Sequence, residues 1–139
     1  MFSLKNKSAV ITGGGSGIGR AISVMFAKAG AVVHIIELNS DAAIDTVNEI
    51  TQAGGKAAAH SCNVSNQQQV LDIYNQIGEI DILVNNAGIA HIGEATTTSE
   101  ADFDRIVSVN VKGVYNSLFA AILLMKQKGK GVFVRRRPK

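Results

Sequence analysis

The chain has 139 residues, of which 46% are hydrophobic and 18% charged, and this composition fits one soluble globular domain. Its single cysteine, Cys62, excludes an intramolecular disulfide and favours a reducing, cytoplasmic location. The net charge of +3 does not indicate a nucleic-acid partner, because four of the fourteen basic residues stand among the last five positions.

Neither a membrane nor a metal is indicated by the sequence. Residues 1–7 lack the apolar core of a signal peptide, and the longest apolar run, Phe119 to Met125, is too short to span a bilayer. The three histidines, His91 among them, have no carboxylate or cysteine at ligand spacing. We interpret residues 135–139 as a solvated basic tail that follows a domain formed by residues 1–134.

Apolar strand-like runs alternate with helical patterns along the chain. The expected strands are residues 8–12, 32–37, 56–61, 80–84 and 131–134. The expected helices are residues 17–29, 41–53 and 67–77, followed by a long one from about 100 to 128. Glycines at 30, 54, 55 and 78 are placed to end the first three helices, and Ser40 and Ser99 to cap the second and fourth.

Strict alternation of strands and helices predicts a parallel sheet with helices on both faces. The expected fold is a doubly wound, Rossmann-type α/β protein, a three-layer αβα sandwich that stops after about the fifth strand. Ligands of such sheets lie beyond the carboxyl ends of the strands, so the loops after Thr12, Glu37, Ser61 and Val84 should converge on one.

The first of these loops is rich in glycine. Residues 12–19 read Thr-Gly-Gly-Gly-Ser-Gly-Ile-Gly, between the apolar run 9–11 and a helix. Glycines let backbone amides approach an anion closely, and the helix that follows directs the positive end of its dipole at the same point. The pattern therefore predicts a phosphate-binding turn.

Glu37 ends the second expected strand, eighteen residues after Gly19. An acidic side chain at this place can accept hydrogen bonds from both ribose hydroxyls of an adenine dinucleotide, and its charge repels a 2′-phosphate. No basic residue stands at positions 14, 15, 38 or 39 to receive that phosphate. We therefore expect NAD as cofactor in preference to NADP, although a plain surface glutamate is the alternative.

Three motifs together identify a resemblance. The glycine spacing Gly-x-x-x-Gly-x-Gly, from Gly13 to Gly19, is joined by Asn-Asn-Ala-Gly at 85–88 and by Asn110 within Val-Asn-Val-Lys-Gly. In this combination residues 4 to 134 closely resemble the short-chain dehydrogenase/reductase family. The resemblance implies hydride transfer between a nicotinamide dinucleotide and an alcohol or carbonyl substrate.

The family's cofactor contacts carry over by position. The resemblance implies that the pyrophosphate and adenosine side is lined by Gly13, Ser16, Gly17, Ile18 and Gly19, the adenosine ribose by Glu37, the adenine by Asn63 and Val64, and a cofactor ribose by Asn86, Ala87 and Gly88. Leu38, directly after Glu37, is also expected to contact the cofactor. The family usually has aspartate where Asn63 stands. An asparagine carbonyl can still accept a hydrogen bond from the adenine amino group. A plain turn is the alternative for residues 85–88.

Asn110 is unusual because asparagine is unfavourable in the middle of a helix. The resemblance implies a catalytic role, in which this asparagine disturbs the helix and helps to hold a water in the proton relay to the catalytic lysine. An asparagine that faces solvent is the alternative.

The chain departs from the family at its catalytic residues. The family uses a serine after the fifth strand and a Tyr-x-x-x-Lys pair, whereas Tyr74 and Tyr115 are followed four residues later by Gly78 and Phe119. After Val134 the sequence reads Arg-Arg-Arg-Pro-Lys. We interpret this change to a short basic run as the result of a frameshift, a premature stop or an artificially shortened chain. A purposeful basic tail is the alternative.

The expected function is therefore NAD binding without turnover, the alcohol or carbonyl substrate belonging to intact relatives. The alternatives are a non-enzymatic nucleotide-binding or interaction module and a nonfunctional fragment. Because the fifth strand and the apolar face of the long helix would lose cover, we also expect self-association, with a homo-oligomer formed through this helix.

Overall fold

A parallel sheet of five strands forms the middle layer of the structure, a computed structural model that describes residues 2–90 and 92–136. The strands are β1 (Ser8–Thr12), β2 (Val32–Glu37), β3 (Lys56–Ser61), β4 (Ile82–Asn85) and β5 (Val132–Arg135). Their order in the sheet is β3-β2-β1-β4-β5, so the direction of winding reverses next to β1. The carboxyl ends of β1 and β4 therefore border the expected ligand site.

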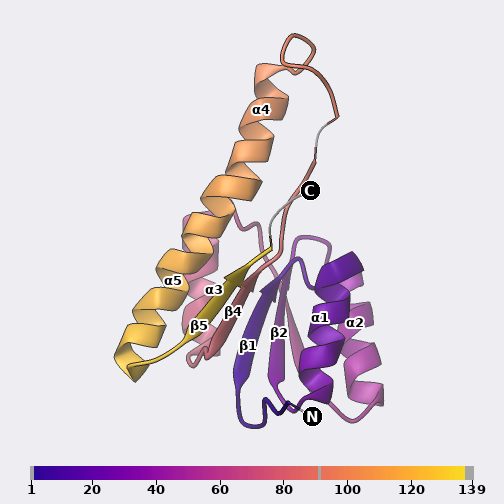
Figure 1. The fold of residues 1–139 in the computed structure, drawn as a ribbon, viewed down its shortest axis with the longest axis vertical. Coiled ribbons are helices and arrows are strands. Elements are labelled where there is room, and N and C mark those ends of the chain that lie inside the picture. The colour runs from indigo at the N-terminus through magenta and orange to yellow at the C-terminus, as the bar shows by residue number, and fades with distance from the viewer. Residues whose placement is uncertain (1, 91, 137–139) are drawn as a thin grey trace.

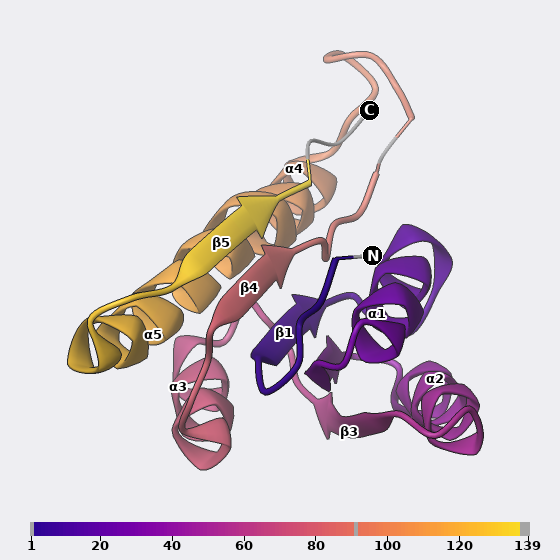
Figure 2. The ribbon, with the colours of Figure 1, turned by 60° about the horizontal axis from the view of Figure 1, so that its bottom comes forward.

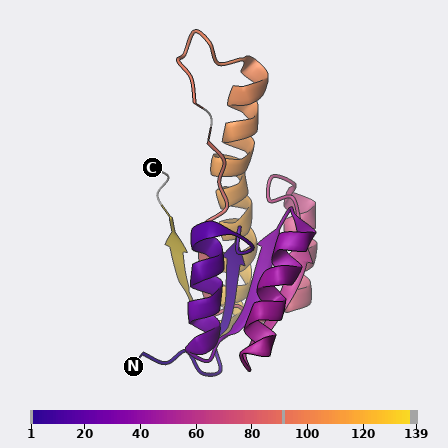
Figure 3. The same cartoon turned by 90° about the vertical axis from the view of Figure 1, so that its right-hand side faces the viewer.

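Helices cover both faces of this sheet (Figure 2). They are α1 (Gly17–Lys28), α2 (Ser40–Gln52), α3 (Gln67–Ile77), α4 (Glu100–Val107) and α5 (Gly113–Lys128), with a π-helical turn, Ser108–Lys112, between the last two. α1 and α2 lie on one face, and α3 and α5 on the other. α4 continues the long helix beyond the end of the sheet (Figures 1 and 3). The predicted doubly wound three-layer architecture is confirmed.

The alternating side chains of β1 fill two separate cores. Ala9 and Ile11 belong to the cluster under α1 and α2, whereas Val10 belongs to the cluster under α3 and α5. All three are fully buried. Burial on both faces explains why the strands read as continuous apolar runs, as parallel strands covered by helices do.

One of the two predicted helix caps is wrong. The side chain of Asn39 accepts hydrogen bonds from the backbone N–H groups of Asp41 and Ala42, and Ser40 is already the first residue of α2. Both residue types are good N-caps, so the pair Asn-Ser is ambiguous by one position. The other cap is confirmed, because the Ser99 hydroxyl accepts from the Asp102 N–H at 3.1 Å.

The fourth strand begins two residues later than predicted. Ile80 is buried in the core, but Asp81 precedes β4, and its carboxylate accepts hydrogen bonds from the Ser8 N–H at 2.9 Å and the Lys128 ammonium at 2.6 Å. Burial alone would raise the pKa of Asp81. The hydrogen bonds from Lys128 and Ser8, with the positive charges of Lys128 and Lys7, outweigh burial and lower this pKa.

By length and composition alone, the continuous helix Glu100–Lys128 is apolar enough to cross a membrane, although 28% of its most apolar window is buried in the protein. Its α5 part packs against α3 and β4. Ala120, Ala121 and Met125 of α5 are buried in the core there. Packing in the sandwich therefore accounts for one side of α5 only, because Tyr115, Phe119 and Leu123 remain exposed.

A histidine pair joins neighbouring strands. His34 of β2 and His60 of β3 stack with ring centroids 5.3 Å apart, and His34 Nδ1 lies 3.1 Å from His60 Nε2. Burial, with a smaller contribution from His60, lowers the pKa of His34 to about 4, and burial also lowers the pKa of His60. The folded protein therefore favours the neutral pair.

This pair predicts a pH dependence of stability. Between the unfolded histidine pKa of about 6.5 and the folded pKa of about 4, the unfolded chain binds more protons, so the free energy of unfolding should fall as pH falls through this window. The measurement is urea unfolding at a series of pH values. His34→Gln should flatten the dependence, and an unchanged slope in that variant would contradict the assignment.

Candidate functional site

The glycine turn connects β1 to α1 in the conformation that the motif requires. Gly13 and Gly17 have positive φ angles of 65° and 54°, which favour glycine, and the Gly13 N–H donates to the Ile36 carbonyl at 2.7 Å. Ser16 is the N-cap residue of α1, but its side chain makes no capping hydrogen bond. The first amides of α1 therefore have no side-chain acceptor from their own cap.

Packing also demands glycine in this turn. A Cβ atom at Gly19 would overlap the carbonyl oxygen of Gly13 and the amide of Asn86, and one at Gly13 would lie 2.9 Å from Ala87 Cα. A Cβ atom at Gly15 would stand 3.0 Å from the backbone of α2. The glycines thus allow the turn to pack closely against α2 and against the loop that follows β4.

Thr12 and Asn86 hold the loops after β1 and β4 together. The Thr12 hydroxyl accepts hydrogen bonds from the N–H groups of Asn86 and Ala87, both at 3.0 Å. The Asn86 side-chain amide donates to the Gly13 carbonyl at 3.0 Å. These bonds fix the predicted Asn-Asn-Ala-Gly segment beside the glycine turn, and the role of Thr12 was not anticipated from the sequence.

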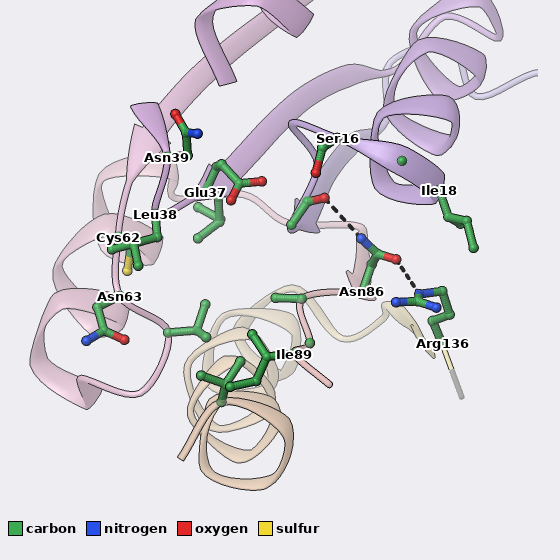
Figure 4. Close-up of a pocket in the computed structure, with 17 residues that line it drawn as sticks. Ser16, Ile18, Glu37, Leu38, Asn39, Cys62, Asn63, Asn86, Ile89 and Arg136 are labelled. Atoms are coloured by element: carbon green, nitrogen blue, oxygen red, sulfur yellow. Dashed lines mark hydrogen bonds between the residues drawn. The ribbon is translucent and has the colours of Figure 1, made fainter. Parts of the chain in front are cut away.

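Glu37 lies at the end of β2, as predicted, beside the same turn. One of its carboxylate oxygens accepts a hydrogen bond from the Gly15 N–H at 3.1 Å. Leu38 follows with 71% of its surface exposed. Figure 4 shows Glu37, Leu38 and Asn63 at one end of the cavity and Ile18 at the other, with Asn86 between them.

The side chain of Asn63 takes part in a local turn with Ser65. Its side-chain oxygen accepts hydrogen bonds from the Ser65 N–H at 3.0 Å and the Ser65 hydroxyl at 2.6 Å. Both lone pairs of this oxygen are therefore engaged within a local turn, and its acceptance from an adenine amino group stays a prediction. Asparagine and aspartate both form such turns readily, so this engagement does not result from the departure from the family's aspartate.

Asn110 lies in the π-helical turn and holds the loop that follows β4. Its side-chain oxygen accepts from the Ile89 N–H at 2.9 Å, and its side-chain nitrogen donates to the Ile89 carbonyl at 2.8 Å. The alternative of an asparagine that faces only solvent is wrong. The two bonds compensate for the poor helix propensity, and π-turns are frequent at functional sites.

Most of the predicted site residues line one cavity of about 560 Å³. They are Gly13, Ser16, Gly17, Ile18, Glu37, Leu38, Asn63, Val64, Asn86, Ala87 and Gly88. Gly19 is buried in the first turn of α1, and Asn110 lines an adjacent cavity of about 300 Å³. The volume of the larger cavity is ordinary for a small-molecule or cofactor site.

Sequence reasoning missed Arg136, Ile89 and Cys62, which also line the larger cavity. Burial raises the pKa of the Cys62 thiol to about 11, so the thiol stays protonated at neutral pH. Arg135 is the last residue of β5, and the Arg136 N–H donates to the Asn85 carbonyl at 2.9 Å. These two arginines therefore continue the edge of the sheet, whereas His91 and residues 137–139 lie outside the described residues.

Neither tyrosine lines these two cavities. Tyr74 is 1% exposed in the core under α3, and Tyr115 is an exposed residue of α5 that stacks on Phe119. Within the described ranges no group of three histidine, cysteine, aspartate or glutamate side chains could hold a metal ion.

The sheet, its helices and the glycine-lined cavity define a Rossmann-type α/β protein. A model of the short chain dehydrogenase family matches residues 7–135. The chain belongs to the short-chain dehydrogenase family.

Individual relatives agree with this assignment. The chain is 42% identical over 135 residues to an uncharacterised oxidoreductase of Thermotoga maritima, covering 96% of this chain and 54% of that protein. It is 37% identical to 7α-hydroxysteroid dehydrogenase of Escherichia coli K12, covering 94% of this chain and 52% of that protein. The chain thus spans about half the length of the curated relatives it matches.

Two solved structures show the same architecture. A 7α-hydroxysteroid dehydrogenase complexed with NADH and 7-oxo glycochenodeoxycholic acid has a TM-score of 0.90 and 36% identity, with 96% of this chain and 53% of that one covered. A putative NAD(P)-dependent gluconate 5-dehydrogenase of Beutenbergia cavernae with bound NADP has a TM-score of 0.91 and 31% identity, with 96% and 55% covered.

Proposed function

We propose that the larger cavity binds NAD through its adenosine and pyrophosphate half. The observation that carries the proposal is that Glu37, at the end of β2, lines the same cavity as the glycine turn and accepts from its Gly15 amide. The carboxylate offers acceptors for ribose hydroxyls, and the turn offers backbone amides for phosphate. The NADH bound to a similar hydroxysteroid dehydrogenase supports this assignment.

The adenine would lie between Leu38 and Val64, which both line this cavity. Because the Asn63 oxygen is engaged by Ser65, Asn63 would contribute its side-chain N–H group as a donor to a ring nitrogen of adenine. Asn110 would act by holding Ile89 and the loop after β4 against the far end of the cofactor.

Hydride transfer between NAD and an alcohol or carbonyl is the reaction we propose for the family's whole enzymes. For the chain described here we propose binding without turnover, because Tyr74 and Tyr115 stand away from the cavity and neither begins a Tyr-x-x-x-Lys pair. NADH titration followed by calorimetry tests the binding. A chain that is folded by circular dichroism but shows no saturable NADH binding would refute the proposal.

Cofactor choice gives a sharper test at Glu37. Glu37→Gln keeps the side-chain shape and removes the charge that repels a 2′-phosphate, so the preference for NADH over NADPH should fall by about tenfold. The measurement is parallel titration with both reduced cofactors. Asp45→Asn on the exposed side of α2 removes the same charge away from the cavity and should leave the preference unchanged. A wild-type chain that binds NADPH as tightly as NADH would overturn the assignment.

A further inference from the structure

Arg136 stands where the two cavities beside the glycine turn meet. It lines both of them, together with Ile18 and Asn86. Its Nε donates a hydrogen bond of 2.6 Å to the Asn86 side-chain oxygen, and Figure 4 shows Arg136 and Ile18 on the same side of Asn86. The backbone bond from Arg136 to Asn85 continues the β4–β5 ladder and holds the residue in this place.

A single amide separates this guanidinium from the glycine turn. Asn86 accepts from Arg136 through its side-chain oxygen and donates to the Gly13 carbonyl through its side-chain nitrogen. The positive charge is therefore fixed beside the turn whose backbone amides suit a phosphate.

Most of the hydrogen-bonding capacity of Arg136 is unused. A guanidinium has five N–H donors, and among the described residues only its Nε has a side-chain partner. No carboxylate of the described chain forms an ion pair with it. Among the described residues that line the larger cavity, Glu37 is the one that is acidic, and it lies at the opposite end (Figure 4).

Such a fork of unpaired donors matches a phosphate, which it can bind through two parallel hydrogen bonds. The same charge disfavours the cationic nicotinamide ring of oxidised NAD by Coulomb repulsion. The end of the cavity near Ile18 is therefore better suited to an anionic group than to the oxidised ring.

We infer that Arg136 is a phosphate-binding residue that makes this cleft take an adenosine diphosphate more readily than oxidised NAD. The terminal phosphate would lie between the guanidinium and the glycine turn. This inference rests on the proposed function, because both place the adenosine beside Glu37. It adds a ligand class, a nucleoside diphosphate, and names the residue that selects it.

The test compares ADP with AMP, which lacks the terminal phosphate, and with oxidised NAD, which carries a nicotinamide riboside on it. Calorimetric titration with ADP, AMP and oxidised NAD is made on the wild-type chain, on Arg136→Gln and on Lys130→Gln. Lys130 borders a different cavity at the start of β5, so its variant matches the charge change away from the cleft. Arg136→Gln should weaken the affinity for ADP by about tenfold, the usual effect of losing a charge-assisted hydrogen bond. The affinity for AMP should fall by less than about twofold.

Lys130→Gln should leave both affinities unchanged. Wild-type chain should also bind ADP more tightly than oxidised NAD, and Arg136→Gln should narrow this difference. Rising ionic strength should weaken the binding of ADP to the wild-type chain more than the binding of AMP. This measurement does not depend on the folding of any variant.

The outcomes separate the two proposals. The inference about Arg136 is overturned if Arg136→Gln lowers the affinities for ADP and AMP equally, or if the wild-type chain binds oxidised NAD more tightly than ADP. The proposed cofactor site stands in both cases. If the wild-type chain binds neither ADP nor NADH, both are overturned. A loss confined to ADP that Lys130→Gln does not reproduce supports the inference.

Discussion

Gly19→Ala is expected to lower the free energy of unfolding by about 3 kcal/mol and to abolish binding of NADH. The added methyl group would overlap the Gly13 carbonyl oxygen and the Asn86 amide. Neither atom can move freely, because the Asn86 side-chain amide donates a hydrogen bond to the Gly13 carbonyl, and the Asn86 backbone N–H donates to the Thr12 hydroxyl. Relief of the overlap must therefore open the contact between the glycine turn and the loop after β4. Urea unfolding and NADH titration measure the two effects.

Gly129→Ala is the matched control for this substitution. Gly129 ends α5 in the left-handed conformation, with a φ of 84°, and a Cβ atom there would meet nothing within 4 Å. This variant should lose only about 1 to 2 kcal/mol of stability through backbone strain and should bind NADH like the wild-type chain. If Gly19→Ala were no less stable than Gly129→Ala, the tight packing of the turn would not be essential.

Asn110→Ala is expected to lower the free energy of unfolding by about 2 to 3 kcal/mol, because two hydrogen bonds are lost together. The N–H and carbonyl of Ile89 would both lose their partner in a partly buried position. Hydrogen exchange resolved by residue gives the most direct measurement. The Ile89 amide should be protected in the wild-type chain and should exchange rapidly in the variant.

Asn110→Asp separates the two bonds. The carboxylate can still accept from the Ile89 N–H, but it places an oxygen against the Ile89 carbonyl in place of a donor, so stability should fall without full loss of amide protection. Asn48→Ala, at an exposed position of α2, serves as the control and should cost nothing, because alanine is the better helix former. Unchanged exchange at Ile89 in Asn110→Ala would contradict the assignment.

The architecture could be predicted because each of its signals is local. Buried runs such as 9–11 show that both faces of a strand are covered, and the alternation of strands and helices leaves few topologies. Glu37 and the glycine turn were assigned to one edge by the rule that ligands lie at the carboxyl ends of parallel strands. The structure brings them together within hydrogen-bonding distance.

The remaining features depend on contacts between distant segments. Asn110 could be recognised as unusual in a helix, but its partner Ile89 is set by the path of the loop after β4. The engagement of Asn63 by Ser65 depends on the conformation of a turn that several sequences could adopt. Arg136 was taken as part of a solvated tail because composition cannot show that β5 extends far enough to carry it to the cleft.

The open edge of the sheet affects how these experiments are done. All four residues of β5 are exposed, and Val132, Phe133 and Val134 each keep more than half of their surface accessible. Any association through this strand would favour the folded state by mass action, so the apparent melting temperature would rise with protein concentration. Variants should therefore be compared at a single concentration, and a dilution series of the wild-type chain should accompany every measurement of stability.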